Sequence, residues 1–144
     1  MFPFSRHTRF IYLGWDTAIT GLESQGLTVN IKGFIWIQGE SDAETHAIAS
    51  AYETSLLSII GDLRNHVVGN STLPIILGVD EQHFLVVDQP AVLDAHKRIA
   101  RNDDQIKFTS MYGLPKADGT HLTPAGLVTH GEQISEALKP LLEK

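Results

Sequence analysis

Two short polar segments hold the side chains that are best suited to catalysis. In one of them, Asp118 precedes His121 by three residues, with Gly119 between them. This spacing lets the carboxylate fold back onto the imidazole Nδ1–H and leaves Nε2 free as a general base, an arrangement that makes up two thirds of a catalytic triad. A surface histidine satisfied by its partner is the alternative, and the pair alone does not decide between the two.

The other segment is Gln38-Gly39-Glu40-Ser41-Asp42, which follows an apolar run and precedes a helical pattern. Backbone N–H groups at such a junction lie beside the positive end of the helix dipole, which suits an oxyanion, and Gly39 permits close approach of a substrate. An ordinary turn, in which Ser41 caps the helix and Asp42 complements the dipole, is the alternative. It leaves the Gln38 and Glu40 side chains unexplained.

The elements that must position these segments follow from hydrophobic periodicity. We expect strands over residues 27–37, 73–79 and 106–110, and helices over residues 15–24, from Ser41 to Val67, over 90–101 and from Pro124 onward. Residues 80–89 and 112–122 are expected to be loops. The alternation of strand and helix predicts an α/β fold with a parallel sheet, helices on both faces and a site beyond the carboxyl ends of the strands.

Capping signals and apolar stripes define the helices more closely. Ser41 and Glu44 form a capping-box pattern, and Thr123 followed by Pro124 predicts the start of the last helix. We expect buried positions in the middle helix at Ile48, Tyr52, Leu56, Ile59, Leu63 and Val67, and in the last helix at Leu127, Ile134, Leu138 and Leu141. The strand over 27–37 is nearly all apolar after Lys32, as expected when both of its faces are covered.

Composition narrows the class of protein. The chain has 144 residues, of which 42% are hydrophobic and 19% charged, so we expect one domain, 1–144, with a single core. The net charge of −6 argues against nucleic acid and anionic membranes as partners. No run approaches the roughly 18 apolar residues of a membrane helix, and Met1 to Phe10 lacks the apolar region of a signal peptide, so localisation stays open.

The cysteine and histidine content of the sequence gives no indication of a cofactor or a metal site. The absence of cysteine excludes disulfides, thiolate metal sites and cysteine nucleophiles. The seven histidines form no His-x-x-x-His or His-Glu-x-x-His pair, so no metal site is expected. Asp80 to His83 is interpreted as a solvated loop, with a wall of the substrate cleft as the alternative, and His96 is given no role.

Taken together, Phe34-Ile-Trp-Ile-Gln-Gly-Glu-Ser-Asp42 and Asp118-Gly-Thr-His121-Leu-Thr-Pro124-Ala-Gly126 resemble a known family. They are similar to blocks of the SGNH-hydrolase superfamily, specifically its sialate O-acetylesterase-like branch and the carbohydrate acetylesterases. The resemblance runs from about Leu13 to the carboxyl terminus. It implies a flavodoxin-like three-layer α/β/α sandwich and a carbohydrate ester, or another small-molecule ester, as substrate.

The resemblance also implies roles for individual residues. His121 would be the general base and then the acid, with Asp118 as its orienter, while Gln38 and Gly39 would help to bind the oxyanion. Glu40 would either organise that loop or act as an additional partner of the histidine.

The nucleophile of the family is a serine in a Gly-Gln-Ser block after the first strand, and nothing before Gln38 matches it; Ser5 and Ser24 lack its context. We therefore expect an SGNH-like chain that lacks its first strand–helix unit, with a degenerate homologue or a site completed by another chain as alternatives. Without that strand, the sheet would expose an edge and an apolar face, which predicts self-association.

Three further interpretations remain open. Gly39-Glu-Ser41-Asp-Ala43 nearly matches the Gly-x-Ser-x-Gly elbow of α/β-hydrolases, with Ser41 as nucleophile. The chain could instead be a carbohydrate-binding domain without turnover. Finally, residues 9–13 could form an extra strand of a small α/β domain.

Overall fold

A parallel sheet of three strands lies at the centre of the computed structural model, which describes residues 6–143. The strands are β1 (Phe34–Ile37), β2 (Ile75–Gly78) and β3 (Ile106–Phe108), in the order β1-β2-β3. Ile75 pairs with Phe34 on one side and with Ile106 on the other. Every residue of β2 is buried, as expected for a central strand flanked on both edges.

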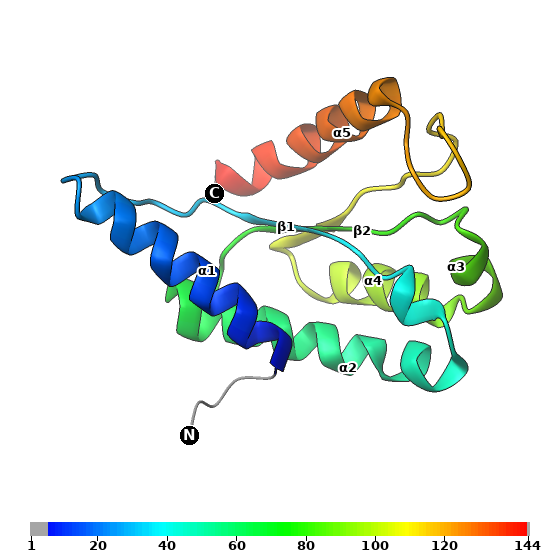
Figure 1. Cartoon of the computed structure of the whole chain (residues 1–144), viewed down its shortest axis with the longest axis horizontal. Helices are drawn as coiled ribbons and strands as arrows, with labels where there is room; N and C mark the ends of the chain where they lie inside the picture. Colours follow the sequence, from blue (N-terminus) through cyan, green and yellow to red (C-terminus); the bar gives the residue numbers. More distant parts are fainter. Residues whose placement is uncertain (1–5, 144) are drawn as a thin grey trace.

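Helices cover both faces of this sheet (Figure 1). One face carries α5 (Pro124–Leu142), and the opposite face carries α2 (His46–Asp62) and α4 (Ala91–Asn102). This is the predicted three-layer α/β/α sandwich with a parallel sheet. The remaining helices are α1 (Arg6–Glu23), the 3-10 turn η1 (Ser41–Ala43), the π-helical turn η2 (Leu63–Val68) and α3 (Phe84–Asp88).

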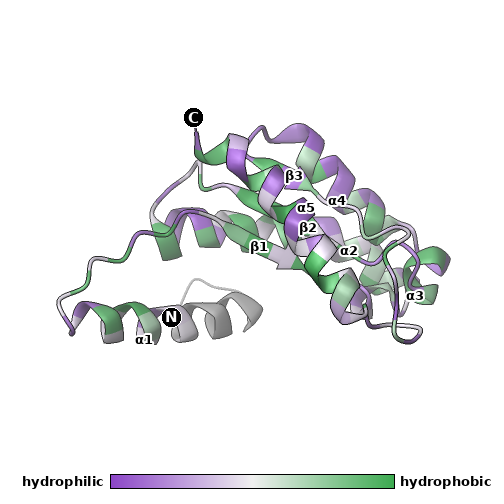
Figure 2. Ribbon diagram, turned by 90° about the horizontal axis from the view of Figure 1, so that it is seen from above, coloured by the Kyte–Doolittle hydropathy of each residue, from purple (hydrophilic) through white to green (hydrophobic). Residues whose placement is uncertain are grey.

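The amino-terminal part of the described chain differs from the prediction. Residues 9–13 are helical and belong to α1, so the alternative of an extra strand is wrong. Figure 2 shows α1 at the periphery, joined to β1 by an extended segment. Within the predicted strand 27–37, only β1 is paired. Its first hydrogen bond to the neighbouring chain segment runs from the Phe34 N–H to Pro74 O at 2.9 Å, next to the first residue of β2.

The core lies mainly between the sheet and the pair α2 and α4. Its largest fully buried apolar side chains are Leu56, Leu63, Leu73, Ile75, Ile76, Leu77, Ile106, Val79, Val86 and Val92. The buried stripe of α2 runs through Ala49, Tyr52, Leu56 and Ile60. The predicted stripe is correct at Tyr52 and Leu56 but wrong at Ile48, which is 43% exposed, and at Ile59, which is half-buried, since Ala49 and Ile60 face the core instead.

The start of α2 also corrects a prediction. Thr45, which has extended φ and ψ angles, is the residue that caps α2, and its Oγ1 accepts the Ile48 N–H at 3.4 Å. Ser41 instead begins η1 and caps nothing, so the capping box expected from Ser41 and Glu44 is wrong. Two cap-forming residues stand four apart here, and the one adjacent to the helix is used.

The start of α5 is as predicted, whereas its buried side is predicted correctly at Leu141 and wrongly at Leu127. Thr123 Oγ1 accepts the Gly126 N–H at 3.1 Å, and Pro124 occupies the first turn. Leu127 is 61% exposed, because Gly126 packs against Pro115 and Leu122 of the preceding loop and His130 lies against Thr109.

The apolar side chains of β1 are covered on one face only. Phe34 and Trp36 are half-buried, and Trp36 Nε1 contacts Tyr52 of α2. On the other face, Ile35 is 48% exposed and Ile37 is 37% exposed. The exposure of these two side chains shows that the expectation of two covered faces is wrong. In addition, no strand among residues 6–143 pairs with the outer edge of β1.

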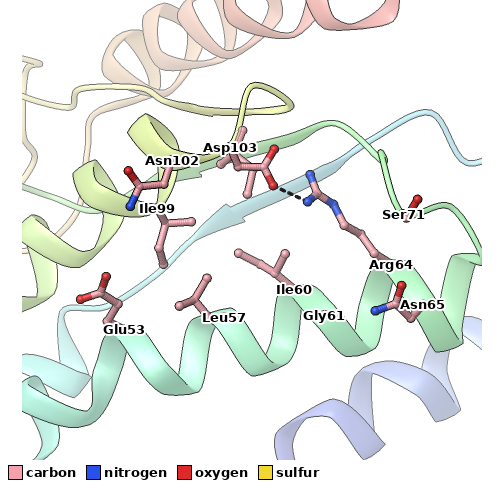
Figure 3. Close-up of a pocket in the computed structure, with 11 residues that line it drawn as sticks. Glu53, Leu57, Ile60, Gly61, Arg64, Asn65, Ser71, Ile99, Asn102 and Asp103 are labelled. Atoms are coloured by element: carbon pink, nitrogen blue, oxygen red, sulfur yellow. Dashed lines mark hydrogen bonds and ion pairs between the residues drawn. The ribbon is translucent and has the colours of Figure 1, made fainter.

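A hollow of about 440 Å³ lies between α2 and α4 near the amino ends of β2 and β3 (Figure 3). Its polar wall is an ion pair between Arg64 Nη1 and Asp103 Oδ2 at 2.5 Å. The same guanidinium donates to Leu73 O from Nε and Nη2. Because its cation is already satisfied by protein groups, this hollow offers no free charge to a ligand.

Candidate functional site

The polar segments that follow the three strands gather at one end of the sheet (Figure 1). Residues 38–42 follow β1, residues 80–83 follow β2, and the loop that precedes α5 follows β3. Parallel strands bring their carboxyl ends to the same edge, which is where α/β folds hold their ligands.

The Asp118–His121 pair has the hydrogen bond that its spacing predicts. Asp118 Oδ2 lies 2.8 Å from His121 Nδ1, and Oδ1 accepts the backbone N–H groups of Thr120 and His121 at 2.7 Å each. The His121 side chain is 76% exposed, and within residues 6–143 its Nε2 has no hydrogen-bond partner. The imidazole is therefore anchored at Nδ1 and open to a reactant at Nε2.

The same contacts fix the charge of Asp118. The hydrogen bond from His121, followed by the two backbone N–H donors, lowers the pKa of the Asp118 carboxyl well below its usual range. The carboxylate is thus ionised throughout the pH range in which histidines change charge, as an orienting acid requires.

Gln38 is held by a buried network beneath the first segment. Its Nε2 donates to Asp42 Oδ2, and its Oε1 lies 3.2 Å from the Tyr52 hydroxyl. Its backbone carbonyl lies 2.9 Å from the same hydroxyl and 3.0 Å from His96 Nε2. Both polar ends of the Gln38 side chain are therefore bound within the protein.

Tyr52 and His96 are the residues that sequence reasoning missed. Tyr52 fits an apolar stripe and His96 lies inside a helix, so their types and spacing gave no signal of a shared role. Burial lowers the pKa of His96 to about 4, and burial also raises the pKa of Tyr52. We assign the His96 proton to Nε2, which then donates to Gln38 O, because the buried Nδ1 has no partner and an unpaired lone pair costs less than an unpaired N–H.

Gly39 is required by packing against the core. Its φ is +143°, and a Cβ there would lie 2.7 Å from Val92 Cγ1 and 3.2 Å from both the Tyr52 hydroxyl and Val79 Cγ2. Its N–H donates to no backbone or side-chain acceptor of residues 6–143. Gly39 is itself buried, so the close approach expected at this glycine is made by core side chains, and its amide has no acceptor among the described residues.

Glu40 lies against the segment that follows β2. Its Oε1 accepts the Asp80 N–H at 2.8 Å, and no hydrogen bond or ion pair within the described chain joins it to His121. Of the two roles expected for Glu40, the contact matches the organising one.

The structure places the predicted residues around two separate hollows. Gln38 lines one of about 330 Å³ with Trp36 and Tyr52, and His121 lines one of about 440 Å³ between β1 and α5. The Gln38 side chain and His121 are therefore not brought into one cavity.

No described serine is bonded to His121. Ser41 is exposed in η1, and no non-glycine residue of the described chain has the positive φ of a strained turn. Ser24 Oγ donates to Gly21 O at 2.8 Å, and Ser5 lies outside the described residues. His121 thus has its orienting acid but no nucleophile beside it.

The part of the chain that the structure describes holds neither a metal site nor a membrane-spanning helix. No group of three or more histidine, aspartate or glutamate side chains is placed to hold a metal ion. None of the described helices combines the length and the apolar character needed to cross a membrane.

Comparison with known proteins gives two matches of different kinds. A family model described as "carbohydrate esterase, sialic acid-specific acetylesterase" matches residues 14–139. The crystal structure of a protein from Arabidopsis thaliana is 28% identical with a TM-score of 0.67. The alignment covers 77% of this chain and 45% of the Arabidopsis chain, so the present chain spans less than half of that protein. No curated protein matches.

Proposed function

Because the chain belongs to the sialic acid-specific acetylesterase family of carbohydrate esterases, we propose that it acts in the hydrolysis of acetyl esters on carbohydrates. The observation that carries the proposal is the 2.8 Å contact between Asp118 Oδ2 and His121 Nδ1, with Nε2 left open. An imidazole oriented in this way by a carboxylate is the general base of serine esterases.

In the proposed reaction, a serine Oγ attacks the ester carbonyl while His121 Nε2 accepts the hydroxyl proton. The tetrahedral intermediate collapses as the bond to the alcohol oxygen breaks, and Nε2 returns the proton to that leaving oxygen. Water then attacks the acetyl-serine with His121 again as base, releasing acetate. Asp118 remains a carboxylate and stabilises the imidazolium that forms in each step.

The free N–H of Gly39 supports an oxyanion-binding role for the first segment. Backbone donors that are fixed before the reaction stabilise the developing charge without reorganisation. Tyr52 and His96 hold the carbonyl of Gln38, which directly precedes this amide. Glu40, the residue after Gly39, accepts the Asp80 N–H through its side chain. We propose that the Gly39 amide is the oxyanion donor, that Gln38 belongs to the oxyanion site by holding this amide in place through its bound carbonyl and side chain, and that Glu40 organises their loop.

The nucleophile is the open part of the proposal. No serine within the described residues contacts His121, so the reaction needs a serine that these residues do not place. Ser41 is the candidate of the alternative, α/β-hydrolase-like reading: it is exposed, caps no helix and lies two residues after the free Gly39 amide. A carbohydrate-binding protein without turnover is favoured by the same lack of a serine at His121.

A two-part experiment tests the proposal on the full chain. Acetate release from O-acetylated sialic acid is measured for wild type, H121A and D118N, with H46A as control because His46 is exposed and distant in sequence from the pair. We expect losses of about 10³-fold or more for H121A and D118N, by analogy with other triads, and none for H46A. Equal rates for wild type and H121A would contradict the role of His121.

Labelling with a fluorophosphonate, which modifies activated serines, then locates the nucleophile by peptide mass spectrometry. An adduct on Ser41 would establish the alternative esterase, and an adduct on Ser5 or Ser24 would assign the nucleophile there. Binding of the acetylated sugar without an adduct and without acetate release would establish the binding protein and overturn the esterase proposal.

A further inference from the structure

Asp80 is a buried carboxylate at the end of β2 and is paired with a lysine from the loop that carries His121. Asp80 is 2% exposed, and its Oδ2 lies 2.5 Å from Lys116 Nζ. Its other oxygen, Oδ1, accepts the Gln82 N–H at 3.0 Å. A buried carboxylate needs both a cation and hydrogen bonds, so the position of the Lys116 ammonium is strongly determined.

The ammonium of Lys116 reaches the histidine loop directly. Besides Asp80, Nζ donates to Gly119 O at 2.8 Å, and Gly119 lies between Asp118 and His121 in the chain. The backbone of Lys116 also pairs with Leu122 in an isolated antiparallel bridge, which closes the base of the loop. The loop is exposed from Asp118 to His121, and within it the Ala117 N–H donates to His121 O at 2.8 Å.

The segment after β2 supports the same loop at further points. His83 Nε2 lies 3.4 Å from Thr120 Oγ1, and Gln82 Oε1 accepts the Gly113 N–H at 2.5 Å. The backbone of Asp80 is held in turn by Glu40 at 2.8 Å. Residues 80–83, interpreted from sequence as a solvated loop, are therefore the support between the two polar segments.

We propose that Lys116 is a positioning residue, which links Gly119 to the buried Asp80 and so holds the Asp118–His121 pair in place relative to Gln38 and Gly39. This role deepens the proposed function and rests on it, because positioning of the Asp118–His121 pair matters for catalysis only if the pair acts in ester hydrolysis. The link itself is a property of the loop that can be measured without any ester hydrolysis.

The test is amide hydrogen exchange by NMR on the full chain. The N–H groups of Thr120 and His121 both donate to Asp118 Oδ1, and the Thr109 N–H donates to Leu77 O in the sheet at 2.9 Å. The exchange rate of the two loop amides is divided by that of Thr109. A general loss of stability raises the exchange rates of all three amides. A loss of positioning raises the rates of Thr120 and His121 alone, and therefore raises the ratio.

For K116M and K116Q we expect this ratio to rise about tenfold, the effect of losing a hydrogen bond with a charged donor. K116R keeps N–H donors at its end and should stay within about threefold of wild type. K139M removes a lysine that pairs with Glu136 on the surface of α5, and it should not change the ratio.

The proposal is overturned if the ratio for K116M and K116Q stays within threefold of wild type, or if K116R raises it as much as they do. Failure of the esterase proposal would appear instead as unchanged acetate release in H121A. The two failures are therefore distinguishable.

Discussion

Glu40 Oε1 accepts the backbone N–H of Asp80 at 2.8 Å, joining segments that follow adjacent strands and lie 40 positions apart in the chain. The backbone pairing of β1 with β2 ends at Ile37 and Gly78. Beyond it, the Glu40 carboxylate takes the place of a backbone carbonyl as the acceptor for an N–H of the neighbouring segment. The contact sets the separation between the Gln38–Gly39 turn and the support of the histidine loop.

The first prediction concerns this contact. Glu40→Ala should lower the free energy of unfolding by about 1–3 kcal/mol, because the part-buried Asp80 N–H loses a charged acceptor. Glu40→Gln should cost less, since its amide Oε1 can still accept. Urea unfolding measures both, with Glu44→Ala, an exposed carboxylate four residues on, as control. Equal losses for the alanine and glutamine variants would contradict the acceptor role.

The second prediction concerns Gly39. Gly39→Ala should destabilise the fold by about 2–4 kcal/mol, because its Cβ would lie 2.7 Å from Val92 Cγ1 in a backbone conformation that suits glycine. The matched control is Gly61→Ala in α2, where a Cβ meets nothing within 4 Å and helix propensity predicts a gain of up to about 1 kcal/mol. Thermal unfolding of both variants gives the comparison. Similar stability for Gly39→Ala and wild type would show that the turn relaxes.

The third prediction uses the buried His96. Its pKa is about 4 in the folded protein and near 6.5 when unfolded, so the unfolded chain binds a proton first as pH falls. The stability that neutral His96 contributes is complete above pH 6.5 and is lost between pH 6.5 and 4, to an extent of about 3 kcal/mol.

Urea unfolding at several pH values checks this. His96→Gln, whose amide N–H can still reach Gln38 O, should remove most of that pH dependence and be less stable than wild type at pH 7. His46→Gln, at an exposed position, serves as control. Identical pH slopes for wild type and His96→Gln would show that another group is responsible.

Local signals predicted what local contacts determine. The Asp118–His121 hydrogen bond follows from a three-residue spacing, and the Thr123–Pro124 start of α5 follows from a cap and a proline, so both are present as predicted. The buried β2 follows from an apolar run that has neighbours on both edges.

The rest depends on partners that are distant in sequence. The cap of α2 is Thr45 because the residues before it form a 3-10 turn, a choice between two local patterns that no spacing rule makes. The roles of His96 and Lys116 arise only when α4 and the histidine loop meet Gln38 and Asp80. Such contacts leave no periodic signal, which is why these positions escaped the sequence-based prediction.

The last prediction concerns the open side of β1. Ile35 and Ile37 are 48% and 37% exposed beside the 61% exposed Leu127, and within the described residues the outer edge of β1 has no partner. An unpaired edge next to an apolar face is a template for association, so we expect the chain to self-associate through it.

Sedimentation velocity over a range of concentrations measures this association. Ile35→Lys places a charge on the edge strand and should weaken association about tenfold or more, whereas Val87→Lys, at a 65% exposed position on α3, should leave it unchanged. A monomer at every concentration, or equal effects of the two lysines, would contradict association through β1. Weakening by Ile35→Lys alone would place the contact at this edge, next to the hollow that His121 lines, where a second chain could bring a serine toward Nε2.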